Sequence, residues 1–246
     1  MVRPGSPEPG GRWSARNSTM LMLLQRAFPD FDKPGLIVGG PAWLNERRFD
    51  IDARAGGTPT PAQYQQMLRL LLADRFRLKT RVEPRPVEVY SLLVARSDGR
   101  LGPRLRPASP KCLAELDAER KRFEGLKGPV TFSSTDAQPC TSATGLQTDT
   151  GLLRLAGGRT LESIAFSLQV FMDKRVVDRA GLTGIYEYDL EFDWNATRST
   201  GLAPADDAAG GSVFTAVQEQ LGLKLERRRE TLDVLVIDSV EMPSEN

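Results

Sequence analysis

The chain has 246 residues, of which 40% are hydrophobic and 26% are charged, as in a soluble globular protein of one large or two small domains. Its 33 Lys and Arg balance 32 Asp and Glu, so the net charge of +1 gives no reason to expect a nucleic-acid partner. The sequence contains no histidine, which excludes Ser-His-Asp and Cys-His catalysis. No apolar run approaches the ~18 residues of a membrane span. Residues 1–10 show no signal-peptide pattern, and we expect them to be disordered.

Two stretches of the chain repeat the same order of predicted elements. Residues 11–96 and 151–246 each show a short strand, a helix, another short strand, a glycine-bearing turn, an alternating strand, a second helix, a charged bend and a final strand. The clearest match is RFRLKTRVEPRPVEVYSLLV at 75–94 with QLGLKLERRRETLDVLVIDS at 220–239. We therefore predict an internal duplication of two α+β modules, in which helices cover one face of a mostly antiparallel sheet.

The first module contains a well-marked helix. Thr60-Pro61-Ala62-Gln63 has the pattern of a capping box with proline in the first turn, which predicts a helix over 60–75. The apolar residues of this helix recur at helical spacing and predict one buried stripe, formed by Tyr64, Met67, Leu68, Leu71 and Leu72. Trp43 is either a binding aromatic or an anchor of the core, and we favour the anchor because large aromatic residues usually bury most of their area.

Residues 97–150 differ in composition from both modules, and we interpret them as a linker or insert. SDGRLGPRLRPASP is rich in proline, glycine and arginine, LAELDAERKRFEGL predicts a short charged helix, and TFSSTDAQPCTSATG reads as a polar loop. The segment holds both cysteines of the chain, Cys112 and Cys140. Without histidine they are too few for a zinc site, and the residue pattern leaves open whether they form a disulfide or two separate thiols.

The second module begins with a helix and an alternating strand. Thr160 is placed to cap a helix over 160–171, whose apolar face consists of Leu161, Ile164, Ala165 and Leu168. Residues 185–194 alternate as in a strand with one buried face. The predicted buried side consists of Tyr186, Tyr188, Leu190, Phe192 and Trp194. The other side carries Glu187, Asp189, Glu191 and Asp193. We interpret this acidic row as solvated, because same-face neighbours lie about 6.5–7 Å apart and do not converge on a cation.

The module ends with a second helix and a charged segment. Ser212, after Gly210 and Gly211, can cap a helix over 213–221 that ends at Gly222. Its predicted buried face consists of Val213, Val217 and Leu221. The two glycines could hold an anion at the helix start, although a capped loop is the simpler interpretation. The basic run that follows is interleaved with Glu226 and Glu230, which predicts a solvated hairpin, and it consists of Lys224, Arg227, Arg228 and Arg229.

A D-x-x-G-x-x-G pattern, formed by Asp178, Gly181 and Gly184, precedes the alternating strand. A phosphate-binding loop would lead from a strand into a helix, whereas a strand follows here. We interpret the glycines as turn residues with positive φ, and Asp178 as a side chain that accepts backbone N–H bonds in an Asx turn. The sequence therefore indicates no catalytic, cofactor-binding or metal-binding residues.

A series of motifs runs in order over residues 11–246: GGPAWL, RFDIDA, LLADRFRLK, VEVYSLLVA, GRTLESIA, VVDRAGLTGIYEYDL, LGLKLE and VLVIDSVEMPSEN. This series resembles the large acidobacterial, Solibacter-type family of uncharacterised secreted proteins built on one domain of unknown function. The resemblance implies a periplasmic or secreted protein. Members of the family usually carry a signal peptide and a first strand before the segment that begins here at Gly11, and we identify neither in this chain. Some relatives are joined to membrane-bound metallopeptidase sensors, which implies a sensory or binding role.

Two functions are compatible with these observations. The first is a non-catalytic extracytoplasmic binding or interaction module without a cofactor, whose partner is an envelope protein or a small ligand. The second is a hydrolase that uses carboxylates or a divalent metal. The missing histidine and the lack of a catalytic motif favour the first. Because the family is exported, we also predict that Cys112 and Cys140 form a disulfide.

Overall fold

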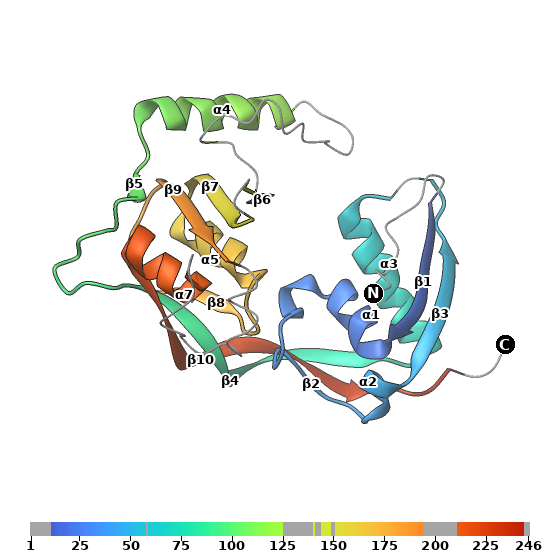
Figure 1. The fold of residues 1–246 in the computed structure, drawn as a ribbon. Helices are drawn as coiled ribbons and strands as arrows, with labels where there is room; N and C mark the ends of the chain where they lie inside the picture. The colour runs from blue at the N-terminus through green and yellow to red at the C-terminus, as the bar shows by residue number, and fades with distance from the viewer. Residues whose placement is uncertain are drawn as a thin grey trace. The chain divides into compact units, whose positions relative to one another are not determined.

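The computed structural model describes residues 11–57, 59–124, 140, 144–148, 151–193 and 211–243. The chain divides into two compact units, which we call unit 1 (residues 1–87 and 230–246) and unit 2 (residues 88–229). Both units combine helices with sheets, so the predicted α+β class is confirmed (Figure 1). Each unit has its own hydrophobic core.

Unit 1 begins with an antiparallel ribbon of two strands, flanked by helices. Its elements are β1 (Arg12–Thr19), α1 (Met20–Ala27), the 3₁₀ turn η1 (Pro29–Phe31), β2 (Ile37–Gly39), α2 (Trp43–Glu46), β3 (Arg48–Arg54) and α3 (Pro61–Arg75). Strand β1 pairs with β3, with Trp13 opposite Ala53. Thr19 ends β1 and caps α1, since its hydroxyl accepts the N–H of Met22 at 3.3 Å. The strand therefore leads directly into the helix that covers it.

Helix α3 has the predicted capping box but not the predicted buried stripe. The Thr60 hydroxyl accepts the Gln63 N–H at 3.3 Å, and the Gln63 side chain accepts the Thr60 N–H at 2.8 Å. Leu68 and Leu72 are buried, whereas Met67 is 39% exposed. The stripe prediction is wrong for Met67 because this side of the helix borders a cavity.

Unit 2 is built around a four-stranded sheet in the order β5-β9-β7-β6. Its elements are β5 (Leu105–Pro107), α4 (Pro110–Glu124), β6 (Thr144–Gln147), β7 (Leu153–Arg159), α5 (Leu161–Gln169), β8 (Val176–Asp178), β9 (Tyr186–Phe192), α7 (Val213–Ala216) and the π-helical turn η3 (Val217–Leu221). All neighbouring strands in this sheet are antiparallel. The two edge strands come from residues 97–150, so this segment is part of the fold and not only a linker.

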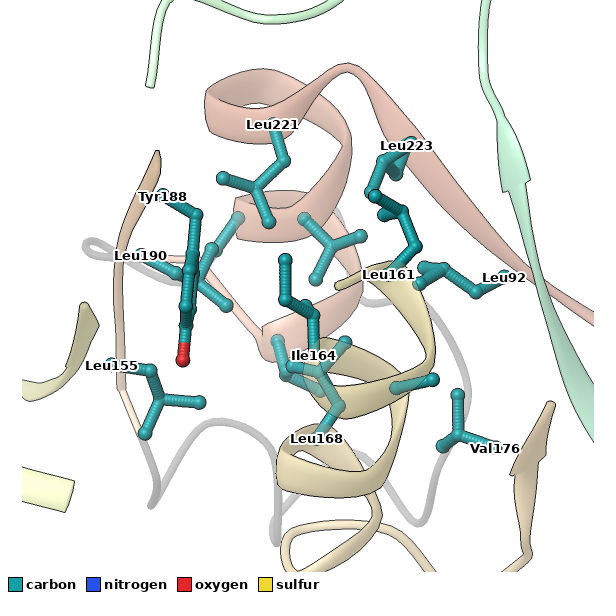
Figure 2. Packing of buried hydrophobic residues seen from close by; sticks show 14 of the residues in the cluster. Leu92, Leu155, Leu161, Ile164, Leu168, Val176, Tyr188, Leu190, Leu221 and Leu223 are labelled. Carbon is teal, nitrogen blue, oxygen red and sulfur yellow. The ribbon is translucent and has the colours of Figure 1, made fainter. Parts of the chain in front are cut away.

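The helix and strand predicted at the start of the second module are confirmed. The Thr160 hydroxyl accepts the N–H of Ser163 at 3.2 Å and caps α5. Side chains along β9 are alternately buried and partly exposed, as predicted. Figure 2 shows Ile164 and Leu168 of α5 in the same apolar cluster as Tyr188 and Leu190 of β9. The last residue of the predicted alternation, Trp194, lies outside the described residues.

Two long strands, β4 (Lys79–Val94) and β10 (Leu223–Ser239), each belong to both units. Both segments were predicted to contain a charged bend, and the predicted hairpin around Glu226 is wrong because the strand continues through it. Every second residue from Lys224 lies on one face of the strand, and there Glu226 pairs with both Lys224 and Arg228. The unit boundaries therefore fall inside these strands, and not at residues 96 and 151.

The two units show the same order of elements. Unit 1 contains β1, α1, β2, β3 and α3, and unit 2 contains β7, α5, β8, β9 and α7 with η3. The short strand β2 pairs in parallel with the end of β10, and β8 pairs in parallel with the end of β4. Strand β10, the partner of β2, follows the last helical turn of unit 2 in the chain. Strand β4, the partner of β8, follows α3, the last helix of unit 1. The internal duplication itself stays a prediction, which superposition of the two units would test.

Candidate functional site

A cavity of about 500 Å³ lies in unit 1. Its lining residues come from the β1–β3 ribbon, the end of α1 and one side of α3, and these elements are labelled in Figure 1. Its wall is mainly apolar and includes Trp13, Pro29, Ala53, Tyr64, Leu68 and Leu71. Cavities of roughly 300–1,000 Å³ with apolar and aromatic walls are typical sites for small ligands. The cavity is therefore the candidate binding site.

The corresponding helix of unit 2 is packed differently. In unit 2, β9 is followed by α7 and η3. These two helical segments bury four apolar side chains almost completely, namely Val213, Ala216, Val217 and Leu221. Figure 2 shows Leu221 in the apolar cluster with Tyr188 and Leu190. Helix α3, which follows β3 in unit 1, buries Leu68 and Leu72 but leaves Tyr64 and Leu71 only partly covered. The two units share one order of elements, but only the helix of unit 1 has an apolar side that is left partly uncovered. The cavity therefore depends on the packing of α3 and not on the order of the elements.

The polar groups of the cavity are cationic or neutral. Arg26 from the last turn of α1, Arg54 at the end of β3 and Gln65 of α3 line it, and no carboxylate is among its described lining residues. The guanidinium of Arg26 lies over the indole ring of Trp13, with Cζ 5.7 Å from the ring centroid. Burial lowers the pKa of Arg26, because the charged form loses part of its hydration. The cavity thus combines an apolar wall with a partly desolvated positive charge.

A shallower hollow adjoins the cavity at α3. Met67 lines both spaces, and the hollow, of about 380 Å³, also contacts Pro59 and Leu70. Leu70 is 63% exposed and Met67 is 39% exposed. These side chains continue the apolar wall to the molecular surface, where a ligand could enter.

Glu187, the first residue of the acidic row, holds the start of α4. Its Oε1 accepts the N–H of Ser109 at 2.8 Å and the Ser109 hydroxyl at 2.6 Å, and its Oε2 accepts from Arg106 at 2.6 Å. The Ser109 hydroxyl, followed by the Ser109 N–H and Arg106, lowers the pKa of Glu187 from 4.5 to about 2. Glu187 is therefore an ionised structural group and not a general acid.

The next carboxylates of the row are also held by arginines. Arg154 donates to both carboxylate oxygens of Asp189 at 2.8 Å. Arg104 lies 3.3 Å from Glu191. Arg154 also lies 3.7 Å from Glu191, so it is shared by Asp189 and Glu191. The carboxylates of Glu187, Asp189 and Glu191 are thus engaged by arginines and do not converge on a cation.

A disulfide between Cys112 and Cys140 fastens α4 to the sheet. The N–H of Gly158 on β7 donates to the carbonyl of Cys140 at 2.9 Å, and a Cβ at Gly158 would lie 2.7 Å from the Cys112 sulfur. Helix α4 therefore packs on the sheet face that carries Glu187, opposite the face covered by α5. The one-face arrangement was predicted for the helices of the two modules, whereas α4 belongs to the segment 97–150 between them. The disulfide and Ser109 anchor α4 at this position.

The two cysteines and Glu187 also have the residue types of a metal site, with ligand atoms within 4.8 Å of one another. Metal binding by cysteine requires a free thiolate, and here both sulfurs are in the disulfide. The carboxylate of Glu187 is already bound by Ser109 and Arg106. We therefore assign this group a structural role.

The D-x-x-G-x-x-G segment has the hydrogen bonding of a turn. Asp178 Oδ1 accepts the N–H of Ala180 at 2.9 Å, and the φ angles of Gly181 and Gly184 are 70° and 93°. The turn connects β8 to β9 in unit 2, so it lies outside the unit 1 cavity.

Trp43 packs against the core of unit 1. It begins α2, contacts Phe49 edge to face at 6.2 Å between ring centroids, and is not among the described lining residues of the cavity. Ser212 has the backbone conformation of an N-cap residue, but its hydroxyl accepts no backbone N–H of α7. It lies instead 3.5 Å from the Thr215 hydroxyl. Gly210 lies outside the described residues.

Residues 22–240 match the model of a family described as "Protein of unknown function (DUF3738)". The chain belongs to this family. The DUF3738 match runs from α1 to the end of β10, so it covers parts of both units and includes Arg26 and α3. No curated protein and no solved structure matches the chain. Among the described residues of this DUF3738 member, no helix is long and apolar enough to cross a membrane.

Proposed function

We propose that the protein is a non-catalytic extracytoplasmic binding module, in which the unit 1 cavity holds a small, mainly apolar ligand. The observation that carries this proposal is the difference between the two units. In unit 2, α7 and η3 bury their apolar side chains almost completely. In unit 1, the apolar side of α3 instead borders a partly open space of about 500 Å³. Selection for binding is a simple reason for keeping such a space.

An extracytoplasmic location is supported by the disulfide. Disulfides persist in oxidising compartments and are rare in the reducing cytosol. The resemblance to a secreted, Solibacter-type family points the same way. A sensory role would require that binding in the cavity be relayed to a partner, such as an envelope protein, and relatives joined to membrane-bound sensors support this possibility.

A catalytic function has less support. The chain lacks histidine, and the carboxylates of Glu187, Asp189 and Glu191 are bound to arginines. A hydrolase would need a carboxylate with a raised pKa, or oxygens that converge on a metal. Glu187 shows the opposite shift of its pKa.

The test is binding of the neutral probe N-phenyl-1-naphthylamine, whose fluorescence rises in apolar surroundings. We expect one molecule to bind per chain, with energy transfer from Trp13 in the cavity wall. Ala53→Phe places a ring inside the cavity and should abolish binding. Ala62→Phe adds the same ring at an exposed position of α3 outside the cavity and should leave binding unchanged.

Gln65→Phe is a second filling variant, in case Ala53→Phe disturbs the β1–β3 ribbon. Circular dichroism should show that all variants are folded. A wild-type protein that does not bind the probe, or filled variants that bind it as tightly as wild type, would show that the cavity is not a binding site.

A further inference from the structure

Resting on the proposed function, we infer that the ligand carries an aromatic ring, and that Ala53 and Ala55 are the residues that admit it. The inference comes from a comparison of β3 with β9, which hold the same place in the order of elements of their units. The inward side chains of β9 are buried in the core of unit 2, whereas the end of the β3 segment borders the cavity of unit 1.

The pairing of the strands shows which positions correspond. The residue just before the threonine that caps α1 lies opposite Phe49, and the residue just before the threonine that caps α5 lies opposite Tyr186. Phe49 of β3 therefore corresponds to Tyr186 of β9. Counting along the two strands from this pair matches Ala53 with Leu190.

The next position on the same side of each strand matches Ala55 with Phe192. Leu190 and Phe192 are fully buried in the core of unit 2, whereas Ala53 and Ala55 line the cavity. The methyl groups of the two alanines fill much less space than the side chains at the matching positions. The cavity therefore lies where unit 2 holds a leucine side chain and a phenylalanine ring.

The contacts of Phe192 indicate that the missing group is aromatic. In unit 2 its ring packs edge to face against Phe171, with 5.1 Å between the ring centroids. Unit 1 has Ala55 in place of this ring, and the rings of Trp13 and Tyr64 line the space that is left. Because aromatic rings prefer edge-to-face or offset contacts with one another, this wall favours an aromatic ligand over a saturated one of the same size.

Two competitors of equal length separate an aromatic ring from apolar volume. They are 4-phenylbutan-1-ol and its saturated analogue 4-cyclohexylbutan-1-ol, and each is used to displace bound N-phenyl-1-naphthylamine. The saturated ring is the more apolar of the two, so burial alone would favour it. We expect the phenyl compound to reach half-displacement at a concentration at least about twofold lower. Equal displacement, or the reverse order, would refute the aromatic ligand.

Ala55→Phe supplies the missing ring from the chain itself. This variant gives unit 1 the residue of unit 2, and we expect it to bind N-phenyl-1-naphthylamine at least about tenfold more weakly than wild type. Ala62→Phe adds the same ring at an exposed position of α3 outside the cavity, and its affinity should stay within about twofold of wild type. Circular dichroism and urea unfolding should show that both variants are folded.

The results separate this inference from the proposed function. If the wild-type protein does not bind N-phenyl-1-naphthylamine, the proposed function fails. If folded Ala55→Phe binds the probe as tightly as wild type, Ala55 does not admit the ligand and the inference fails, whereas Ala53→Phe and Gln65→Phe still test the apolar site. If Ala62→Phe loses as much affinity as Ala55→Phe, the loss does not come from filling the cavity. If Ala55→Phe does not fold, the two alcohols still decide the inference on the wild-type protein.

Discussion

The contact between Glu187 and the start of α4 makes stability depend on acid pH. The folded-state pKa of Glu187 is about 2, below the ordinary value of 4.5. Its stabilising effect is therefore fully present above pH 4.5 and is lost as the pH falls toward 2. A shift of about 2.5 units corresponds to an upper limit of about 3.4 kcal/mol at about 1.36 kcal/mol per unit. Because Arg106 is 74% exposed and screened by solvent, we expect about 2 kcal/mol from Glu187.

Glu187→Gln removes the charge with little change in size. We expect this variant to be less stable than wild type by about 2 kcal/mol at pH 7, and by less than about 1 kcal/mol at pH 3. Urea unfolding followed by far-UV circular dichroism, with the disulfide intact, measures the difference at each pH. Lowered pKa values at Asp52, Asp98 and Glu226 make both proteins sensitive to acid, so only the difference between them reports on Glu187.

Glu219→Gln serves as the control, since Glu219 is an exposed carboxylate of the same unit. It should leave the free energy of unfolding within about 0.5 kcal/mol of wild type at every pH. A destabilisation by Glu187→Gln that is equally large at pH 7 and pH 3 would refute the reasoning, because it could not come from the charge.

Three further predictions concern unit 2. Intact-mass analysis after alkylation should find no modified cysteine without reductant and two with it, and alkylation of Cys112 and Cys140 without reductant would contradict the disulfide. Gly158→Ala should lower the free energy of unfolding by about 1–3 kcal/mol, because its Cβ would lie 2.7 Å from the Cys112 sulfur. This loss of stability should be smaller in a protein in which Cys112 and Cys140 are both replaced by alanine. An equal loss in that protein would exclude the sulfur contact as the cause. Gly184→Val should lower the free energy of unfolding by about 1–3 kcal/mol, because valine at φ 93° strains the backbone. Asp178→Ala should lower it by about 1 kcal/mol, because the hydrogen bond to the N–H of Ala180 is lost, and neither variant should change probe binding. An Asp178→Ala variant that keeps normal stability but loses probe binding would make Asp178 a site residue.

The parts of the fold that the sequence predicts best are those that depend on neighbours in the chain. The capping box at Thr60 and the alternation of β9 need only local hydrogen bonds and one apolar face, and both are present in the structure. The charged centres of β4 and β10 were interpreted as bends because polar runs often mark turns. Here the charges pair along one face of a continuous strand, a pattern that charge content alone does not distinguish from a bend.

The candidate site could not be predicted from the sequence. The apolar spacing of α3 shows which side chains share a face, but not whether another element covers that face. Tyr64 and Met67 were therefore assigned to the core, although they line the cavity. Arg26 gave no signal either, because its significance depends on Trp13, which the chain brings to it from the preceding strand.

The shared long strands also constrain the order in which the protein can fold during synthesis. Unit 1 includes residues 230–246, so its parallel pairing of β2 with β10 cannot form until the ribosome has made all of unit 2. Unit 2 is thus an insertion within unit 1, and residues 88–229 can become compact first. A nascent or prematurely terminated chain would expose the unpaired edge of β2 and part of the unit 1 core. Cutting the gene between the two repeated stretches would likewise yield two incomplete units instead of two domains.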